Sequence, residues 1–464
     1  MSWPLDDGAQ LSWALPKLSL RPGSYYLNLK IEKKQPKSKF RAALNRAMLW
    51  FGAIKRVKIK HMKILAIETS CDETAIAILK VESEKLKADN QRLKINNFNI
   101  LSNVVASQVK LHKKYGGVWP TLAKREHQKN LPIVLKKALK ESKLLKKRTK
   151  NKESIRQLAD KNQELEKILQ REPNLFKTLL NFLKRYKKPK IDFIAVTIGP
   201  GLEPCLWTGV NFSKALAFWW DLKIIPVNHI EAHILVNFLN QELQTELFPA
   251  ICLVVSGGHT QLVLMKNFGK YKIIGETRDD AAGECFDKTA RILGLSYPGG
   301  PTIAAEAAKF NTQHSTLNIQ LPSPMIHSKD YDFSFSGLKT AVLYQIKNQS
   351  ASRRTRIKNK EFIREMAKEI QNAINNVLIK KTIKAAKNYK AKSIILGGGV
   401  TANKDLRKRL EIKIKKEIPN TKYFIPEIRH ATDNALMIGV ASYFNSKKAT
   451  NWKNIKANAN LRIA

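Results

Sequence analysis

Two histidines four residues apart, in the segment His229-Ile-Glu-Ala-His233, have a spacing that could do chemistry. On a helix, positions i and i+4 lie on one face, so both imidazoles could hold the same metal ion. A third ligand has to come from elsewhere, and Asp433 is a candidate, although it could instead cap the last helix. The zinc-protease motif HExxH needs Glu directly after the first histidine, whereas this chain has Ile230 there and Glu231 one position late.

Three short loops have the composition of phosphate or nucleotide contacts. They are Glu68-Thr-Ser-Cys-Asp-Glu73, Ser256-Gly-Gly-His-Thr260, and Gly397-Gly-Gly399 followed by Val-Thr-Ala-Asn403. Glycine lets the backbone come close to a ligand, and amides in such turns or at a helix N-terminus bind anions. Each loop alone could be an ordinary tight turn, but three of them at predicted strand ends favour a phosphate-bearing ligand. None matches the Walker loop or GxGxxG, which disfavours standard P-loop and Rossmann sites.

Three further stretches, 112–127, 279–301 and 332–340, are dense in histidine, glycine, aspartate or small polar residues. In the second stretch, Asp279 and Asp280 stand where a carboxylate could cap a helix N-terminus. Asp287 lies a turn or more further into the same predicted helix, where capping does not explain it. We therefore expect Asp287 to contact a ligand.

The elements that must position these residues form two similar sets. Each set begins with a hairpin whose turn is polar or glycine-rich, and its later strands alternate with helices. This pattern predicts an α/β protein of two lobes, duplicated, with a cleft between them. The predicted strands are 63–68, 74–79, 100–105, 193–198, 250–255, 260–265, 271–276 and 393–396, and the predicted helices include 121–142, 211–221, 403–416 and 433–444.

The charge of the chain is strongly positive. Its 464 residues carry 83 Lys+Arg against 38 Asp+Glu, a net charge of +45. Such a balance favours a polyanionic partner, either nucleic acid or an anionic membrane surface. Candidate nucleic-acid contacts are two basic clusters: Arg353, Arg354, Arg356, Lys358 and Lys360, and Arg407, Lys408 and Arg409. Either cluster could also be a solvated helix face.

Two segments contribute much of that charge. Residues 1–61 hold 13 basic and 3 acidic side chains without a sustained apolar period, and we interpret them as an extension outside the fold. Residues 146–190 hold 15 basic and 5 acidic side chains, with apolar residues at helical spacing. We interpret this second segment as a helical insertion, either an RNA-contacting arm or a solvated surface. The predicted lobes then span 62–248 and 249–450.

The remaining composition points to the cytoplasm. The four cysteines, Cys71, Cys205, Cys252 and Cys285, have no close pair, which argues against a disulfide framework or a cysteine zinc site. No apolar stretch approaches the roughly 18 residues of a membrane span. The first ten residues lack the order of a signal peptide.

Ten motifs occur together and in order in this chain: ETSCDET, HxxYGG, GPGL, NHIEAH, VSGGHTQL, DDAAGECFDK, YPGGP, FSFSGLKTA, GGGVTAN and TDNALMIG. Between about Met62 and Phe444 the chain resembles the TsaD family, formerly described as endopeptidases. The resemblance implies an actin-like, sugar-kinase-like ATPase (ASKHA) fold. It also implies transfer of a threonylcarbamoyl group from its adenylate to the adenosine 3′ of the anticodon in tRNA.

The resemblance also assigns site residues, motif by motif. It implies that His229, His233 and Asp433 bind one metal ion, iron or alternatively zinc. It associates Glu73 and Asp287 with catalysis. It implies that the threonylcarbamoyl-adenylate is held by Val254, Val255, Ser256, Gly257, Gly258, Asp287, Gly300 and Asn403.

Two departures from the family pattern lie outside these positions. Thr121 stands where the family typically has Glu, and Lys223 stands where a proline is common. The resemblance implies tRNA as substrate and two protein partners, a noncatalytic TsaB-like paralogue and a small TsaE-like ATPase. A metalloprotease and an ATP-dependent scaffold of the same fold stay open as alternatives at this point.

Overall fold

The first half of the chain builds a mixed sheet from a hairpin and two later parallel strands. The computed structural model describes residues 60–83, 97–148, 155–239, 241, 245–310, 319–347 and 359–463. Within these ranges the first sheet has the strand order β3-β2-β1-β4-β5. β1 pairs antiparallel with β2 and parallel with β4. The strands are β1 (Lys60–Glu68), β2 (Glu73–Ser83), β3 (Asn97–Ser107), β4 (Phe193–Gly199) and β5 (Lys223–Asn228).

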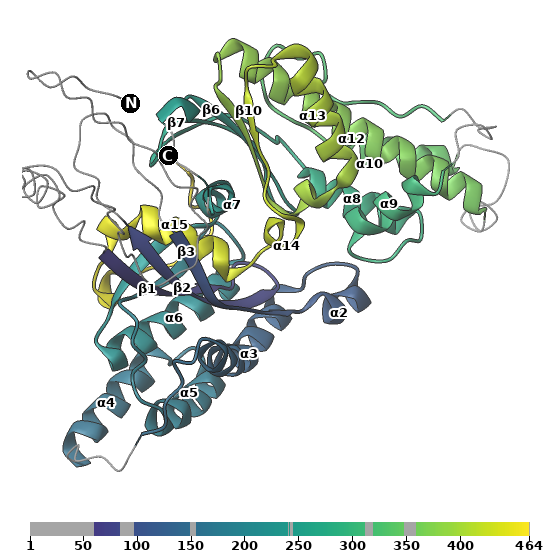
Figure 1. The fold of residues 1–464 in the computed structure, drawn as a ribbon. Coiled ribbons are helices and arrows are strands. Elements are labelled where there is room, and N and C mark those ends of the chain that lie inside the picture. The colour runs from purple at the N-terminus through teal and green to yellow at the C-terminus, as the bar shows by residue number, and fades with distance from the viewer. Residues whose placement is uncertain are drawn as a thin grey trace, which may run out of the picture. The chain divides into compact units, whose positions relative to one another are not determined.

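The two faces of this sheet bury different sets of side chains. Successive residues of a strand point to opposite faces, and in β1 Leu65 and Ile67 lie in one hydrophobic cluster while Ile64 and Ala66 lie in another. Figure 1 shows that two helices, α3 (Pro120–Glu141) and α6 (Glu203–Trp220), cover the first of these faces. The helices between β3 and β5 are α2 (Val109–His112), α3 (Pro120–Glu141), α4 (Ile155–Ile168), α5 (Pro173–Arg185) and α6 (Glu203–Trp220).

The second half repeats the same plan. Its sheet has the order β10-β9-β6-β7-β8, in which β6, β7 and β8 are antiparallel and β6, β9 and β10 are parallel. In reverse, this order is β8-β7-β6-β9-β10, and each strand corresponds to the strand at the same place in the first order, β3-β2-β1-β4-β5. The strands are β6 (Ala250–Val255), β7 (Thr260–Asn267), β8 (Lys270–Glu276), β9 (Ser393–Gly397) and β10 (Lys422–Phe424).

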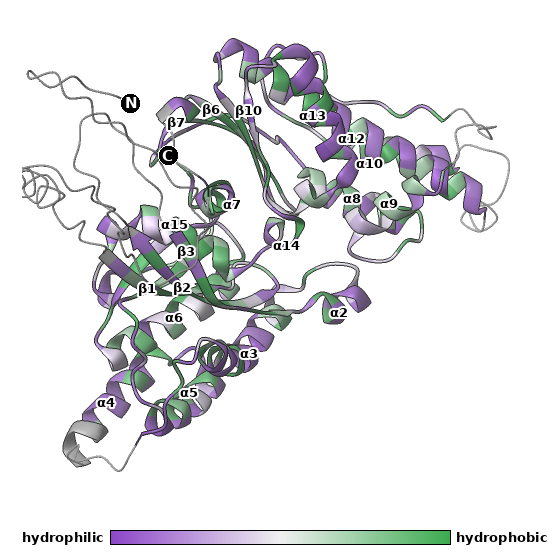
Figure 2. Cartoon of the chain, in the orientation of Figure 1, coloured by the Kyte–Doolittle hydropathy of each residue, from purple (hydrophilic) through white to green (hydrophobic). Residues whose placement is uncertain are grey.

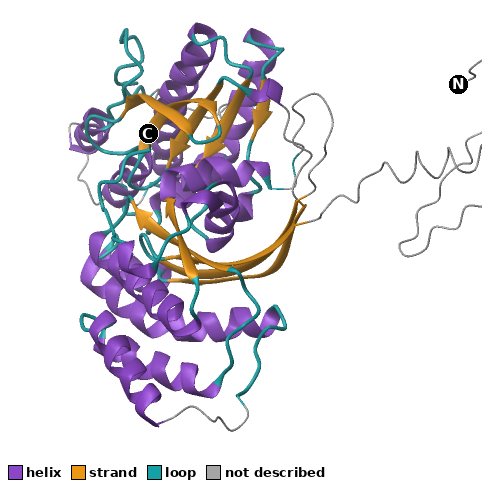
Figure 3. Ribbon diagram, turned by 90° about the vertical axis from the view of Figure 1, so that its left-hand side faces the viewer, coloured by secondary structure: helices purple, strands orange, loops and turns teal. Residues whose placement is uncertain are grey.

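Helices cover the outer face of the second sheet, where Ile251, Leu253 and Val255 are fully buried. Figure 3 distinguishes the strands of both sheets from the helices that cover them. The helices of this half are α8 (Ala282–Ile292), α9 (Gly299–Ala308), α10 (Ser336–Lys347), α12 (Lys360–Asn388), α13 (Lys404–Glu417), α14 (Ile428–Ala431) and α15 (Ala435–Phe444). Two sheets of identical connectivity confirm the predicted duplicated, two-lobed α/β fold of the actin-like class.

Two helices lie between the sheets and belong to both. α7 (His229–Leu235) contacts β4, β5, β6 and β9, and α15 contacts α7 and all five strands of the first sheet. Their apolar residues join one cluster with side chains of β1, β2, β6 and β7. Figure 2 shows α15 with largely hydrophobic residues, as expected of a helix buried on most sides. Although α15 comes last in the second half, it therefore packs on the first lobe.

The basic insertion contributes to the core of the first lobe. Leu165 and Leu169 lie at 0 and 1 % exposure, and Leu175 and Leu179 of α5 are fully buried. α4 contacts α5 and α6, and α5 contacts α3. The predicted amphipathic pattern is thus confirmed for the described side chains, and Lys167, Lys177 and Lys184 are exposed.

The last described residues return to the first lobe. Thr450 pairs with Ile224 at the edge strand β5, and the Asn458 N–H donates to the Ile198 carbonyl over 2.7 Å. Arg462 continues to β8 of the second sheet, where its guanidinium lies 2.8 Å from Glu276. The tail therefore contacts both lobes. None of the four cysteines forms a disulfide, and among the described residues no helix is apolar over a length that would cross a bilayer.

Candidate functional site

The two histidines of the opening motif lie on the short helix α7, directly after β5. Asn228 caps this helix, because its Oδ1 accepts from the N–H groups of Ile230 and Glu231 over 2.9 and 3.1 Å. His229 and His233 are both buried, and their ring centroids are 4.7 Å apart with planes at 87°. The i, i+4 spacing thus places both imidazoles on one side of α7, as predicted.

Asp433 joins the histidines from the other end of the chain. Its Oδ1 lies 3.0 Å from Nε2 of His233 and 3.5 Å from Nε2 of His229. The alternative role for Asp433, capping the last helix, is taken by Asn434, whose Oδ1 accepts from the Met437 N–H over 3.1 Å. The three ligand atoms lie within 4.8 Å of one another, so this group could hold a metal ion.

Glu68, at the end of β1, fixes the orientation of the His229 ring. Its Oε2 lies 3.2 Å from Nδ1 of His229 and accepts from the Thr197 hydroxyl over 2.6 Å. A carboxylate on one ring nitrogen leaves the other nitrogen free to bind a metal, which is the usual arrangement around metal-bound histidines. The sequence analysis assigned Glu68 only to a possible phosphate loop and did not assign it this role.

The charges of this group favour a bound cation. Burial alone would lower the pKa of His229, but Asp433 and Glu68 outweigh it and raise that pKa to about 9. Burial would raise the pKa of Asp433, yet the two histidines hold it well below its usual range. A site whose carboxylates stabilise a proton on His229 also suits a divalent ion at the same place. The donor set of two imidazoles and one carboxylate fits such an ion.

Glu231, between the two histidines, is occupied elsewhere. Its carboxylate is buried and accepts from the Tyr271 hydroxyl over 3.0 Å and from the Asn445 amide over 2.8 Å. It therefore serves the packing of α7 against its neighbours and is not free to act as a general base beside the histidines. The metalloprotease alternative has no catalytic glutamate in this motif.

The first loop is held by a buried histidine from α3. His127 donates through Nε2 to the Cys71 carbonyl over 2.9 Å, and its Nδ1 lies 2.8 Å from the Thr74 hydroxyl. Burial lowers its pKa to about 4, so it stays neutral. Glu73, in the same loop, begins β2, and the Ser107 hydroxyl lies 3.3 Å from its Oε1. Burial, followed by the neighbouring Asp72 carboxylate, raises the pKa of Glu73 well above its usual range.

The second loop turns tightly between β6 and β7. Val254 and Val255 precede it with fully buried side chains, so they could reach a ligand only through the main chain. The Ser256 hydroxyl accepts from the His259 N–H over 3.1 Å. Gly257 and Gly258 are exposed, and a Cβ added at either would meet no atom within 4 Å. The two glycines therefore face open space at the end of β6.

Asp287 lies on α8, facing the start of α9. Its Oδ1 accepts from the Gly299 N–H over 2.6 Å. Burial raises its pKa to about 6, against the opposing effect of that hydrogen bond. The next residue, Gly300, lies in the first turn of α9, and a Cβ there would meet no atom within 4 Å. Asp287 and the open start of α9 thus lie together.

The third loop joins β9 to α13 and leads to Asn403. Asn403 caps α13 by accepting from the Leu406 N–H over 3.0 Å, and its amide donates to Gln371 over 2.9 Å. Both ends of its side chain are therefore engaged within the protein. Gly398 has φ +90°, and a Cβ there would lie 2.4 Å from the Val255 carbonyl oxygen. Only glycine fits this close approach of the third loop to the second.

The acidic stretch before α8 corrects one expectation. Asp279 does not cap α8; it accepts from the N–H and hydroxyl of Ser336 and from the Ser334 hydroxyl, and so holds the start of α10. Asp280 pairs with Lys288 over 2.5 Å. The N-cap of α8 is Ala281, without a side-chain bond. Both aspartates therefore have partners within the protein, but not the helix end that they could have capped.

These loops share one structural location. β1, β4 and β5 end at Glu68, Gly199 and the start of α7, while β6 and β9 end at the second and third loops. A Cβ at Gly397 would lie 2.7 Å from the His233 carbonyl oxygen, so the third loop touches the histidine helix. Ligands of open α/β sheets bind at the carboxyl ends of the strands.

Comparison with known proteins decides the family. The model of TsaD, described as tRNA N6-adenosine threonylcarbamoyltransferase, matches residues 99–150 and 170–440. A relative with that name from Geobacillus kaustophilus is 39% identical over 390 residues, covering 83% of this chain and 93% of the relative. One from Syntrophomonas wolfei is 39% identical over 389 residues, covering 84% and 94%. The chain belongs to the TsaD family. The TsaD match includes α5 and omits residues 1–98, 151–169 and those after 440, and the gap at 151–169 contains all of α4.

Two solved structures show weaker likeness to this TsaD chain. HypF from T. kodakarensis has a TM-score of 0.44 at 12% identity and covers 84% of this chain and 48% of its own. YeaZ from Pseudomonas aeruginosa has a TM-score of 0.22 at 10% identity and covers 46% of this chain and 65% of its own.

Proposed function

We propose that this protein transfers the threonylcarbamoyl group from threonylcarbamoyl-adenylate to the exocyclic amine of the adenosine 3′ of the anticodon, position 37, in tRNAs that read codons beginning with adenine. AMP is the other product. The observation that carries the proposal is the His229, His233 and Asp433 group in a member of the TsaD family. The relatives are named for this activity, and the match with this chain covers more than nine-tenths of the length of each.

The cofactor we propose is one divalent metal ion per subunit, iron, with zinc as the alternative. His229 and His233 would hold it through Nε2, and Asp433 through a carboxylate oxygen. Such an ion, when bound, polarises the carbonyl of the donor and orients it. Glu68 keeps the His229 ring in the tautomer that this binding requires, because it accepts from Nδ1.

The glycine loops and α9 suit the phosphate of the adenylate. Gly257 and Gly258 present main-chain groups toward open space, as does Gly300 in the first turn of α9. Backbone N–H groups at such positions bind anions and stabilise a departing phosphate. Asp287 would accept hydrogen bonds from donor hydroxyls. Val254, Val255, Ser256 and Asn403 would support this pocket through their main chain and through the loops that they fix.

The transfer forms a C–N bond between the adenosine amine and the carbamoyl carbon, while the C–O bond of the mixed anhydride breaks. The amine loses a proton in this step, and Glu73 is our candidate to accept it. A carboxyl whose pKa is raised by burial and by Asp72 is a stronger base once ionised. The target base must leave its stack, which costs less in a loop than in a duplex.

The test is direct incubation of the purified protein with threonylcarbamoyl-adenylate and tRNA, followed by analysis of the nucleosides. Threonylcarbamoyladenosine at position 37 supports the proposal. Its absence with the full set of partner proteins and with metal would contradict it. We propose a TsaB-like paralogue and a TsaE-like ATPase as partners, tested by omitting each one. We also propose that the protein works in the cytoplasm.

A further inference from the structure

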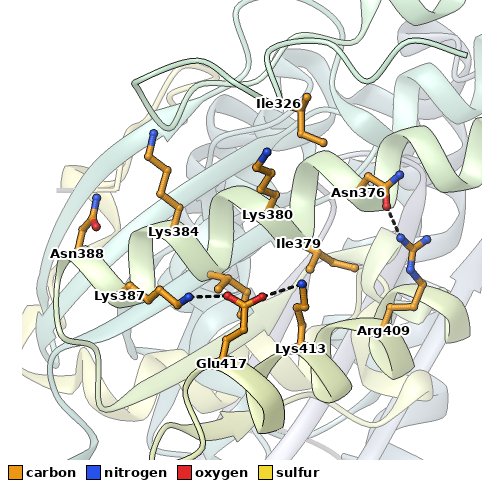
Figure 4. Close-up of a pocket in the computed structure, with 11 residues that line it drawn as sticks. Ile326, Asn376, Ile379, Lys380, Lys384, Lys387, Asn388, Arg409, Lys413 and Glu417 are labelled. Carbon is orange, nitrogen blue, oxygen red and sulfur yellow. Dashed lines mark hydrogen bonds and ion pairs between the residues drawn. The ribbon is translucent and has the colours of Figure 1, made fainter.

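A basic groove runs between α12 and α13 on the second lobe. It encloses a cavity of about 570 Å³. Figure 4 shows that one stripe of α12 and one stripe of α13 face it, with Ile326 contributed by the loop before α10. The lining residues are Ile326, Asn376, Ile379, Lys380, Ile383, Lys384, Lys387, Asn388, Arg409, Lys413 and Glu417. No residue of this groove belongs to the site described above.

The groove concentrates positive charge. Five of its side chains are cationic, and Glu417 is its one carboxylate. The charges of α12 are segregated in the same sense: its acidic residues Glu361, Glu365 and Glu369 lie in its first three turns, while residues 371–388 contain four lysines and no acid. The second half of α12, which lies beside α13, therefore carries only positive charges.

Internal ion pairs do not cancel this charge. Glu417 is shared by Lys387 over 2.5 Å and Lys413 over 2.7 Å, so one carboxylate serves two cations. Both lysine side chains are about half exposed, at 47 and 48 %. Exposed pairs of this kind contribute about 0–1 kcal/mol and are readily exchanged for a stronger anion. The lysines can therefore turn to an incoming anion without unfolding the groove.

The shape of the groove selects an extended anion. Lys380 and Lys387 are seven positions apart on α12, with Lys384 between them, so the three lysines extend over about 10 Å along the helix axis. A single phosphate group cannot contact all three. The apolar floor offers little to a hydrophobic partner, because Ile379 and Ile383 are only 5 and 4 % exposed. A chain of several anions matches both the length of the row of lysines and the small exposed apolar surface beneath it.

We propose that this groove binds the phosphate backbone of the tRNA substrate, away from the reacting base. The inference rests on the proposed function, which supplies RNA as the polyanion. α13 connects the two places: it begins directly after the third loop of the candidate site, and Arg409 and Lys413 follow Asn403 by six and ten residues, about 9 and 15 Å along the axis. A substrate with one base at the strand ends can therefore continue along this helix into the groove.

Of the basic residues predicted from the sequence to contact nucleic acid, the groove contains Arg409. Arg407 points back into the protein, where its Nε donates to the Thr401 carbonyl. Arg409 lines the groove and pairs with Asp405 over 3.2 Å. Of the other cluster, Lys360 begins α12, while Arg353, Arg354, Arg356 and Lys358 lie outside the described residues.

The test neutralises three groove lysines together, Lys380→Gln, Lys387→Gln and Lys413→Gln. Lys384 is left in place because it donates to the carbonyls of Ser328 and Lys329. The matched control changes three exposed lysines of the β7–β8 hairpin on the same lobe: Lys266→Gln, Lys270→Gln and Lys272→Gln. Both variants lose the same charge, and circular dichroism and melting establish that both are folded.

Binding of tRNA is measured without the donor, over a series of salt concentrations. We expect the groove variant to bind about tenfold or more weakly at moderate salt, and the slope of log K against log[salt] to fall by about 2 to 3. At saturating tRNA its kcat should equal that of the wild type. The control variant should change neither the affinity nor the slope by comparable amounts.

Equal effects of the two triple variants would overturn the proposal, because net charge alone would then explain binding. Unchanged tRNA binding with lost binding of polyglutamate would also overturn it and assign the groove to an acidic protein. Because binding is read without transfer, a wild-type protein that binds tRNA through the groove but modifies no adenosine would refute the proposed function and leave this inference standing.

Discussion

Glu68 is the residue on which the orientation of the His229 imidazole depends. It is fully buried, and its two oxygens bond Thr197, His229 and the Ser70 N–H. We expect Glu68→Gln to weaken metal binding about 10–100-fold with little change in the fold, because the neutral amide stabilises the tautomer less. Titration with Fe²⁺ or Zn²⁺ under a competing chelator measures this. Ser70→Ala is the control. It removes the uncharged Ser70 hydroxyl, which lies 3.2 Å from Nδ1 of His229, and we expect it to have a smaller effect on metal binding.

His233 offers one of the three candidate ligand atoms of the group. We expect His233→Ala to lose the stoichiometric metal and to abolish transfer, while the protein stays folded. Elemental analysis and the nucleoside assay read the two effects separately. His61→Ala is the matched control, since this side chain is half exposed near the start of β1. Normal turnover of His233→Ala without metal would refute the ligand assignment.

Asp287 gives the reaction a pH dependence with a defined sign. Its pKa is raised to about 6, so the carboxylate that we place on donor hydroxyls takes up a proton as the pH falls through 6. We expect kcat/KM for the donor to decline over that range. Asp287→Asn should be less active and should lack this inflection, leaving only other titrations such as that of Glu73. A variant profile with the same inflection would contradict the assignment.

At the scale of elements, most of the fold could be predicted from the sequence. Continuous apolar runs predicted β1, β2 and β6 to within a few residues. β5 was missed because it is a short edge strand that contains Pro226, a residue tolerated there and rarely expected in a strand. α6 begins at Glu203, eight residues before the predicted start, since Pro204 occupies its first turn, where proline costs nothing.

The site was predictable where residues are close in sequence. The spacing of His229 and His233 fixed their common face, whereas Glu68 reaches His229 from 161 positions earlier, through a packing that no local pattern encodes. The same limit applies to α15. Its apolar composition predicts burial, but only the tertiary structure shows that it packs on the first sheet.

α4 lies between the two stretches that match the family model, and a truncation within it tests whether it is part of the core. Leu165 is fully buried in the first lobe. We expect Leu165→Ala to reduce the free energy of unfolding by about 2–5 kcal/mol, the range for a leucine truncated in a packed core. Urea unfolding measures it, with Gln163→Ala as the exposed control on the same helix. A change below about 0.5 kcal/mol would mean that α4 docks only loosely.

At the scale of the whole molecule, the net charge divides into parts with different expected roles. Residues 1–61 and the 146–190 segment each carry +10, and the rest of the chain carries +25. The predicted extension is two residues too long, because Lys60 and His61 pair with Ser83 and Glu82 in the first sheet. We expect removal of residues 1–57 to leave the melting temperature and transfer activity unchanged, because residues 58–464 form a compact unit by themselves. Thermal melting and the nucleoside assay check this. A large loss of stability would show that the extension belongs to the fold.

The group formed by His229, His233 and Asp433 also constrains when the enzyme can mature. Asp433 follows His233 by 200 residues. At a synthesis rate of about 5–20 residues per second, the ribosome makes the second histidine about 10–40 s before the aspartate. A nascent chain that has emerged only through its first lobe therefore offers two of the three proposed ligands. If these three side chains hold the proposed ion, its stable loading waits until Asp433 has been made, and we expect a chain terminated before Asp433 to lack the metal.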